Sequence, residues 1–319
     1  MQQAPFTDKE HPIPLFPYSP IPLYYPYMLK SGRSKTLLFL SIVLALLLAL
    51  GITLWVFFHR PPVLIVMDIS FSQLYGPERL ERQSRRIASS FFRQVIPVLV
   101  DESAGPELVA IAAEEAFEAP WAVIFPYRYH DGARRYKEAM PETPVFVIGG
   151  SLRALEGDPY YVLADTRTDL YRAGMAAALL TGVRKPLLFY DGDLPDGYRE
   201  AFQRGLEDQG SLSEPVYVVA SASYSSWSEI GCVVVAGPAA DFAEQSLDIP
   251  VILFSWIDPS LTPGTVKLVF DDSHLALAVE ALKAQPAVEI FLPSSPSIFR
   301  DRIGEKGTYV KLKDIIRKK

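Results

Sequence analysis

The sequence predicts an α/β protein with two lobes, each built on a parallel sheet, and one transmembrane helix before them. Three observations support this fold class. Residues 36–58 are an apolar run without a charge, short apolar runs recur along the rest of the chain, and helix-like segments separate most of these runs. Continuous apolar strands that alternate with helices are typical of parallel sheets joined by right-handed crossovers.

The N-terminal residues 1–35 are expected to form a proline-rich cytoplasmic tail. They contain seven prolines, which favour extended or polyproline II conformations over helix. Such a tail is either a disordered leader or a docking peptide for an aromatic groove, and composition alone is enough for the first interpretation.

Residues 36–58 are expected to be an uncleaved membrane anchor. The run has 23 residues, and at about 1.5 Å per residue it can cross a hydrocarbon core of about 30 Å. It is longer than the apolar region of a cleavable signal, and no small-x-small cleavage site follows it. The single cysteine, Cys232, lies far downstream, so no lipidated cysteine follows the run and no disulfide can form within one chain.

The charges that flank this run predict its orientation. Lys30, Arg33 and Lys35 precede it, whereas Arg60 alone follows closely. Because the positive flank of a transmembrane helix stays in the cytoplasm, we expect a cytoplasmic N-terminus and an extracytoplasmic domain over residues 61–319. The protein is therefore predicted to cross the cell inner (cytoplasmic) membrane once, as a signal anchor.

The extracytoplasmic part is predicted to divide into two lobes. About 259 residues after the anchor fit two modest cores better than one oversized sheet. The first lobe is expected at about 61–155 and the second at about 160–260, with hinge-crossing and C-terminal segments at 261–319. The strands are expected at residues 63–68, 95–100, 121–125, 144–150, 160–165, 186–192, 215–220, 232–237, 250–256 and 266–272.

A helix rich in small residues is predicted to begin at about residue 166. Thr166 is the expected cap, and Asp169 stands in the position of a capping-box acid. Gly174 lowers helix propensity by about 1 kcal/mol relative to alanine. Its presence therefore indicates a close approach to the neighbouring sheet or to a second helix.

The charge distribution argues against nucleic acid as a partner. Residues 61–299 hold 18 Lys and Arg against 32 Asp and Glu, whereas residues 300–319 hold eight basic and three acidic residues. Phosphate binding requires clustered Lys and Arg, which an acidic body does not offer. The basic end is either a solvated charged segment or a contact for anionic lipid.

Enzyme signatures are sparse. The chain has no glycine-rich phosphate loop, no G-x-G-x-x-G after a strand, no G-x-S-x-G elbow and no H-E-x-x-H motif. Asp271, Asp272 and His274 offer ligand types that suit a divalent ion, but adjacent acids at a strand end usually serve a turn or a helix cap. We expect no enzymatic activity, no metal and no other cofactor.

The candidate ligand-binding residues follow the apolar runs. In open parallel sheets, ligands bind outside the carboxyl ends of the strands. Aromatic rings there can sandwich a flat ligand or a sugar face, and carboxylates accept hydrogen bonds from hydroxyls or amines. The candidates are Ser70, Phe71, Tyr75, Tyr127, Gly150, Asp165, Asp191, Trp256, Asp258 and Asp271.

Three stretches together resemble the second lobe of the type 1 periplasmic binding proteins, including the basic membrane protein group of nucleoside receptors. They are "YYVLADTRTDLYRAGMAAALLTG", "KPLLFYDGDLPDGYREAFQRGLEDQG" and "GCVVVAGPAADFAEQSLDIPVILFSWID". The resemblance implies two Rossmann-like lobes that are joined by three crossovers and close on a small ligand. Carried over by position, it places Ser70 and Phe71 of "MDISFSQLY" at the ligand, and Asp165, Asp191, Trp256 and Asp271 at the cleft or hinge.

The chain also departs from this family. Its secreted members usually carry a cleaved or lipidated leader and its repressor members a DNA-binding motif, whereas this chain has a proline-rich tail and a membrane span. We expect a membrane-anchored extracytoplasmic solute-binding protein for a nucleoside-like or sugar-like ligand. It would serve an ABC transporter permease or a signalling membrane protein. The alternative is a degenerate binding fold that acts as a cell-envelope interaction or structural module.

Overall fold

The computed structural model describes residues 31–149, 159–190, 194–219, 224–236, 248–258, 265–284 and 289–317. The chain divides into two compact units, Met1–Leu54 and Trp55–Lys319. Gly150 and Asp191, two of the candidate ligand-binding residues, lie outside the described residues.

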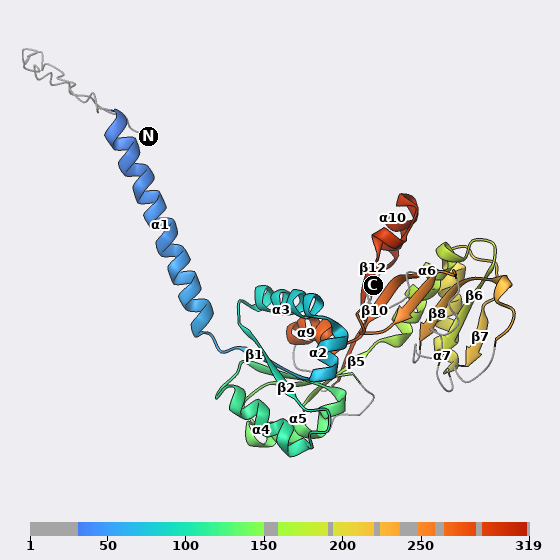
Figure 1. The fold of residues 1–319 in the computed structure, drawn as a ribbon, viewed down its shortest axis with the longest axis horizontal. Coiled ribbons are helices and arrows are strands. Elements are labelled where there is room, and N and C mark those ends of the chain that lie inside the picture. Colours follow the sequence, from blue (N-terminus) through green and yellow to red (C-terminus); the bar gives the residue numbers. More distant parts are fainter. Residues whose placement is uncertain are drawn as a thin grey trace, which may run out of the picture. The chain divides into compact units, whose positions relative to one another are not determined.

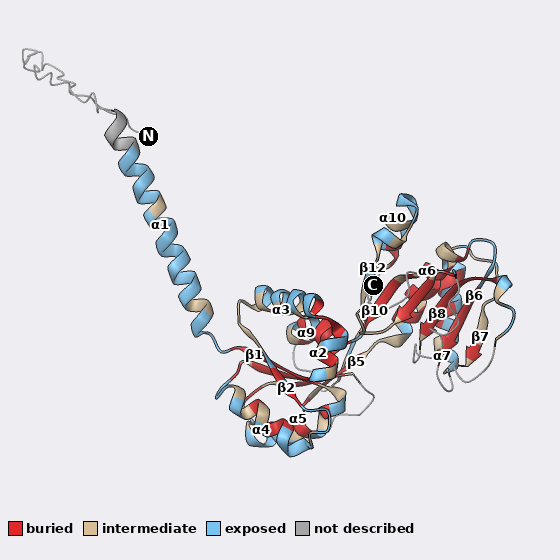
Figure 2. Cartoon of the chain, viewed as in Figure 1, coloured by how far each residue is buried: buried red, intermediate tan, exposed pale blue. Residues whose placement is uncertain are grey.

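The N-terminal helix α1, Ser31–His59, contains the candidate membrane span (Figure 1). Within it, Thr36–His59 is long and apolar enough to cross a membrane. The side chains of its apolar window are not buried against protein, and Figure 2 shows almost the whole helix as exposed.

The first lobe is a six-stranded parallel sheet with the order β11-β5-β4-β3-β1-β2. Helices cover both faces, as expected for a parallel sheet. Its strands are β1 (Val63–Asp68), β2 (Val95–Val100), β3 (Ala122–Pro126), β4 (Val145–Ile148), β5 (Tyr160–Ala164) and β11 (Glu289–Leu292). Its helices are α2 (Ile69–Tyr75), α3 (Pro77–Phe91), α4 (Pro106–Ala116), α5 (His130–Ala139) and α9 (His274–Lys283), with a 3-10 turn η1 (Tyr127–Tyr129).

Strand β1 shows why the apolar runs of this lobe are continuous. All its residues are buried. Val63 and Ile65 pack into the core that α2, α3 and α9 cover, whereas Leu64 and Val66 pack into the core that α4 and α5 cover. Because both faces of the sheet are covered, both sets of alternating residues have to be apolar.

The second lobe is a six-stranded sheet with the order β12-β10-β9-β8-β6-β7, in which only β12 runs antiparallel to its neighbour. Its strands are β6 (Lys185–Tyr190), β7 (Val216–Val219), β8 (Ile230–Ala236), β9 (Val251–Phe254), β10 (Val266–Asp271) and β12 (Ser295–Ile298). Its helical segments are α6 (Thr166–Thr181), α7 (Asp196–Asp208), η2 (Trp227–Glu229), η4 (Arg300–Arg302) and α10 (Lys306–Ile315).

The chain passes between the lobes three times, from β5 to α6, from β10 to α9 and from β11 to β12. The two-lobed α/β fold with three crossovers is therefore confirmed. The lobe boundary is wrong in one detail, because β5 was expected to open the second lobe and instead pairs with β4 in the first sheet. A buried apolar strand fits either sheet, so its sequence does not reveal which sheet it joins.

The start of α6 differs from the expected cap by one residue. Asp165, not Thr166, caps the helix, since its carboxylate accepts hydrogen bonds from the backbone N–H (3.1 Å) and the hydroxyl (2.6 Å) of Thr168. Asp169 does not close a capping box. Its carboxylate accepts a hydrogen bond from the backbone N–H of Ser294 at 2.8 Å, which ties α6 to the third crossover.

Gly174 explains why α6 carries so many small residues. A Cβ atom at this position would lie 2.2 Å from the backbone oxygen of Phe202 in α7, and one at Gly205 would lie 2.1 Å from the backbone oxygen of Tyr171. The two helices thus cross with backbone against backbone at a pair of glycines. The expected close approach is present, and it is made to a second helix rather than to the sheet.

Candidate ligand-binding site

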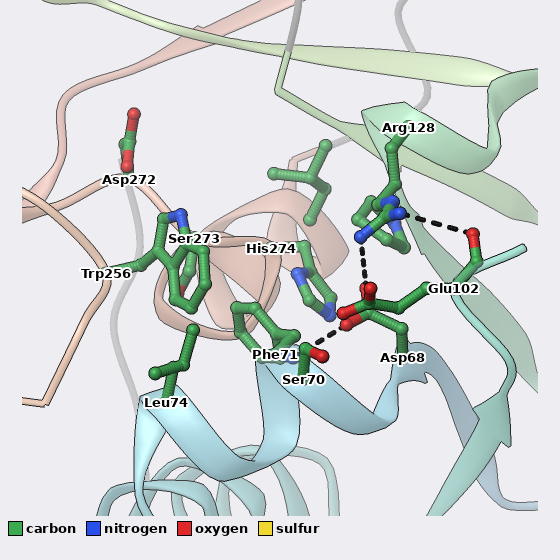
Figure 3. Close-up of a pocket in the computed structure, with 12 residues that line it drawn as sticks. Asp68, Ser70, Phe71, Leu74, Glu102, Arg128, Trp256, Asp272, Ser273 and His274 are labelled. Atoms are coloured by element: carbon green, nitrogen blue, oxygen red, sulfur yellow. Dashed lines mark hydrogen bonds and ion pairs between the residues drawn. The ribbon is translucent and has the colours of Figure 1, made fainter. Parts of the chain in front are cut away.

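A cavity of about 410 Å³ lies at the carboxyl ends of strands of the first sheet. Residues from the first lobe, from the crossover into α9 and from the segment after β9 contribute to its wall. The lining residues are Asp68, Ser70, Phe71, Leu74, Glu102, Pro126, Arg128, Ile148, Trp256, Asp272, Ser273 and His274. Figure 3 shows Trp256 at one end of the cavity, Arg128 and Asp68 at the other, and His274 between them.

Asp68 and Arg128 form the polar end of the cavity. Asp68 ends β1 and caps α2, and its Oδ1 accepts a hydrogen bond from the backbone N–H of Phe71 at 2.6 Å. Its Oδ2 accepts a hydrogen bond from Nη1 of Arg128 at 2.8 Å. The Asp68 carboxylate is buried, whereas the Arg128 side chain is 49% exposed. The guanidinium, with five N–H donors, is therefore held at the cavity wall and can donate to a ligand.

Phe71 is packed into an aromatic cluster rather than left open for stacking. Its ring centroid lies 5.0 Å from that of Tyr75, 4.9 Å from Trp256 and 4.6 Å from His274. The residue is 8% exposed. Phe71 thus forms an apolar wall, and the half-buried Trp256 is the ring of this cluster that can offer a face to a ligand.

His274 presents an unused hydrogen-bond acceptor to the cavity. It is 4% exposed, and its Nε2 has no hydrogen-bond partner among the described residues. Burial lowers the pKa of this imidazole to about 4, although Asp68 and a hydrogen bond to the backbone of Val66 oppose the shift. The ring is therefore neutral at physiological pH. Because the hydrogen bond to Val66 fixes the tautomer, the lone pair of Nε2 can accept a proton donor of a ligand.

Tyr75 and Asp271 lie outside the cavity wall and bind each other. The Tyr75 hydroxyl donates to Oδ2 of Asp271 at 2.9 Å, and Nη2 of Arg79 donates to the same oxygen at 2.5 Å. Nη1 of Arg79 also donates to the backbone oxygens of Trp256 and Ile257, both at 2.9 Å. These contacts join α2 and α3 of the first lobe to the ends of β9 and β10 of the second.

The remaining candidates have structural contacts of their own. Asp165 caps α6, and the Tyr127 ring stacks on His130 at 5.1 Å. The backbone N–H of Asp258 donates to the backbone oxygen of Leu74 at 2.7 Å. Among the described candidates, the structure thus brings Ser70, Phe71 and Trp256 to the cavity and places the others elsewhere.

Sequence reasoning missed most of the polar wall. Asp68 stands at the end of an expected strand, and Arg128 follows the third strand by two residues. Both positions satisfy the strand-end rule that selected the other candidates. The sequence suggests for His274 only the role of a metal ligand. Among the described residues, no group of three or more His, Cys, Asp or Glu could hold a metal ion. Asp271 contacts Arg79 and Tyr75 instead.

The chain has the type 1 periplasmic binding protein fold. A solute-binding protein of an ABC transporter system from Conexibacter woesei DSM 14684 is similar over 80% of this chain and 95% of its own, with a TM-score of 0.55 and 11% identity. A transcriptional activator of the comK gene from Bacillus halodurans is similar over 80% of this chain and 96% of its own, with a TM-score of 0.56 and 12% identity. At such identities the likeness shows the fold alone. No protein-family model and no curated protein sequence matches the chain.

Proposed function

We propose that the chain is a membrane-anchored extracytoplasmic receptor that binds a small nucleoside-like or sugar-like ligand in the cavity between β1 and Trp256. The observation that carries this proposal is the buried Nε2 of His274, which has no hydrogen-bond partner in the described part of the chain and lies in the wall of a cavity of about 410 Å³. A buried polar atom without a partner is unfavourable by about 1–3 kcal/mol. A ligand that donates a hydrogen bond to this atom removes that penalty.

The charges of the wall favour an uncharged or cationic ligand over an anion. Asp68, Glu102 and Asp272 carry negative charge, against the single positive charge of Arg128. A nucleoside or a monosaccharide fits this requirement, because each offers hydroxyl or amine donors and a flat or apolar face for Trp256. The basic membrane protein group of nucleoside receptors is the subgroup that this ligand class would suit.

Anchoring by α1 is part of the same proposal. The receptor would lie in the inner membrane with its N-terminus in the cytoplasm, as the flanking charges Lys30, Arg33 and Lys35 favour. Its partner would then be an ABC transporter permease or a signalling membrane protein in the same membrane. Binding, not catalysis, is the activity proposed, and neither nucleic acid nor a cofactor has a part in it.

One observation favours the second candidate function, an interaction or structural module of the cell envelope. The contacts of Arg79 with Asp271 and with the backbone after β9 already join the lobes without a ligand. A fold whose lobes are held in this way could serve as a rigid scaffold.

Thermal unfolding of the full chain in detergent micelles separates the two functions. Nucleosides, purines, monosaccharides and amino acids are screened for a raised melting temperature, since a ligand at about 100 times its dissociation constant stabilises by roughly 2.7 kcal/mol. We expect at least one compound to raise the melting temperature, and we expect Trp256→Ala and His274→Phe each to reduce this increase. Trp227→Ala, which removes an indole that packs on a core of the second lobe and does not line the cavity, is the matched control and should leave the shift intact. A screen without any shift would favour the scaffold.

A further inference from the structure

Phe92 adopts a backbone conformation that is unusual for its residue type. It follows α3 with φ of 53°, and among the described residues it is the one non-glycine with positive φ. Glycine is the usual residue at such a left-handed helix end, because a Cβ atom is unfavourable there. A bulky side chain in this position indicates that the contact made by the side chain outweighs the local backbone strain.

The Phe92 ring packs against the C-terminal end of α1. The ring centroid of Phe57 lies 5.3 Å from that of Phe92, and the guanidinium of Arg60 lies 5.4 Å from the same ring. Phe57 lies in the last turn of α1, which ends at His59. Arg60 lies in the linker before β1, which begins at Val63.

A second aromatic group holds the linker between α1 and β1. The backbone N–H of Trp121 donates to the oxygen of Pro62, and Nη1 of Arg93 donates to the oxygen of Pro61, both at 2.8 Å. The guanidinium of Arg93 lies 4.6 Å from the Trp121 ring, and the Phe91 ring lies 5.1 Å from it. We call the whole group the collar, which consists of Phe57, Arg60, Phe91, Phe92, Arg93 and Trp121.

The composition of the collar is that of a membrane interface. Tryptophan and other aromatic rings gather at the headgroup level, where one end of the side chain meets hydrocarbon and the other meets water. Arg60 and Arg93 supply positive charge that can bind lipid phosphate. Phe92, Arg93 and Trp121 are neither buried in the core nor fully exposed, and Arg60 is exposed.

The length of the chain places the collar close to the membrane. Thr36–His59 has 24 residues, which span about 36 Å as a helix, against a hydrocarbon core of about 30 Å. The last turn therefore reaches the headgroup layer. Three residues separate His59 from Val63, so the start of β1 lies at most about 14 Å from the end of the helix. Arg93 and Trp121 of the collar bind the backbone directly before this start.

We propose that the collar is a lipid-binding surface, which docks the first lobe on the phospholipid headgroups around its own anchor. Phe92 and Trp121 enter the interfacial layer, and Arg60 and Arg93 bind phosphate groups of neighbouring lipids. The inference rests on the proposed anchoring by α1, and it adds a second attachment that does not depend on the ligand cavity.

Fluorescence quenching in vesicles tests this attachment. The full chain is reconstituted into phosphatidylcholine–phosphatidylglycerol vesicles that carry spin-labelled lipid. A fluorophore is attached at Phe92→Cys or at Ser90→Cys, the second of which keeps Phe92 in place. Leu212→Cys, at a fully exposed residue of the second lobe, is the matched control. The native Cys232 is buried, so the fluorophore is expected to label the introduced cysteine. Lipid that is labelled near the headgroup should quench the probes at positions 90 and 92 at least about twofold more than the control. Adding Arg60→Gln and Arg93→Gln should reduce the difference.

A fluorophore attached at Ile42→Cys, within the candidate membrane span, tests the anchoring independently of the collar. If deeply labelled lipid does not quench it, the anchoring proposal fails. If it is quenched while the probes at positions 90 and 92 are quenched no more than that at position 212, the anchor stands and the lipid-binding collar is overturned.

Discussion

Nη2 of Arg79 in α3 and Oδ2 of Asp271 at the end of β10 lie 2.5 Å apart, and this ion pair joins the two lobes. The side chains are 9% and 3% exposed. The Arg79 guanidinium also lies 4.3 Å from the Tyr75 ring. The pair is therefore largely buried, so each charge depends on the other for compensation.

Removing one partner of this pair should strongly destabilise the protein. Arg79→Ala leaves the buried Asp271 carboxylate without its counter-ion, and we expect a loss of about 3–5 kcal/mol in the free energy of unfolding. Chemical denaturation of the full chain in detergent measures this loss. Arg85→Ala in the same helix is the control. It breaks an exposed pair with Glu81 and should lower the free energy by less than about 1 kcal/mol. Equal losses in the two variants would contradict the structural role of the Arg79–Asp271 pair.

The glycine crossing of α6 and α7 predicts an unusual response to alanine. Gly174→Ala places a Cβ atom against the backbone of Phe202, and we expect a destabilisation of about 1–3 kcal/mol despite the better helix propensity. Gly174→Leu should be worse. Gly197→Ala, at a helical glycine with open space around its Cβ position, should be neutral or stabilising by about 0.4–1 kcal/mol. Thermal melting compares the variants, and an unchanged midpoint for Gly174→Ala would disprove the close crossing.

Asp169 should make the stability fall as the pH rises from 4 to 6. Burial raises its pKa to about 6, although Ser294 and Arg172 oppose the shift, whereas an unfolded aspartate titrates near 3.9. The folded chain therefore holds the extra proton in this window, and the free energy of unfolding decreases with increasing pH.

Asp169→Asn tests this dependence because its amide oxygen can still accept from the backbone N–H of Ser294. At pH 7 the variant should be more stable than the wild type by up to about 3 kcal/mol, and the difference should vanish near pH 4. Denaturation across this pH range gives the two curves. Asp314→Asn, which removes an exposed carboxylate, controls for the change in net charge. Parallel curves for Asp169→Asn and the wild type would refute the assignment.

The orientation in the membrane can be measured in spheroplasts with a membrane-impermeant maleimide. Leu212→Cys is fully exposed in the second lobe and should react in intact spheroplasts, because the flanking charges favour an extracytoplasmic domain. Ser34→Cys, on the flank that is predicted to be cytoplasmic, should react only after lysis. The reverse pattern would show that the predicted topology is wrong.

The sequence was sufficient to predict the helices and strands, which depend on the local chain. It was insufficient to predict the contacts between residues far apart in the sequence. The apolar run from Thr36 and the buried strands were predicted, since hydrophobic length and continuity are properties of the local chain. Tyr75 and Asp271 were expected at a ligand, yet they bind each other across 196 residues. A strand-end position shows that a residue reaches the carboxyl edge of a sheet, but not which residue from the other lobe meets it there.

The same limit explains the polar wall of the cavity. Asp68 is not among the sequence candidates, although it stands at a strand end as Asp165 and Asp271 do, and in the structure it caps α2. Its second oxygen, however, binds Arg128. His274 is a candidate acceptor because α9 packs into the first lobe, where burial takes the imidazole out of water. The sequence does not show which lobe α9 joins.

The route of the chain between the lobes has a consequence for biosynthesis. The first sheet is completed by β11, which pairs with β5, although Leu292 at its end follows Ala164 by 128 residues. At about 5–20 residues per second, a ribosome needs roughly 6–26 s to produce that stretch. During this interval β5 is a bare sheet edge that can pair with another nascent chain. The first lobe therefore begins to form early but is completed late, and its incomplete form is the stage at which a chaperone would be most needed.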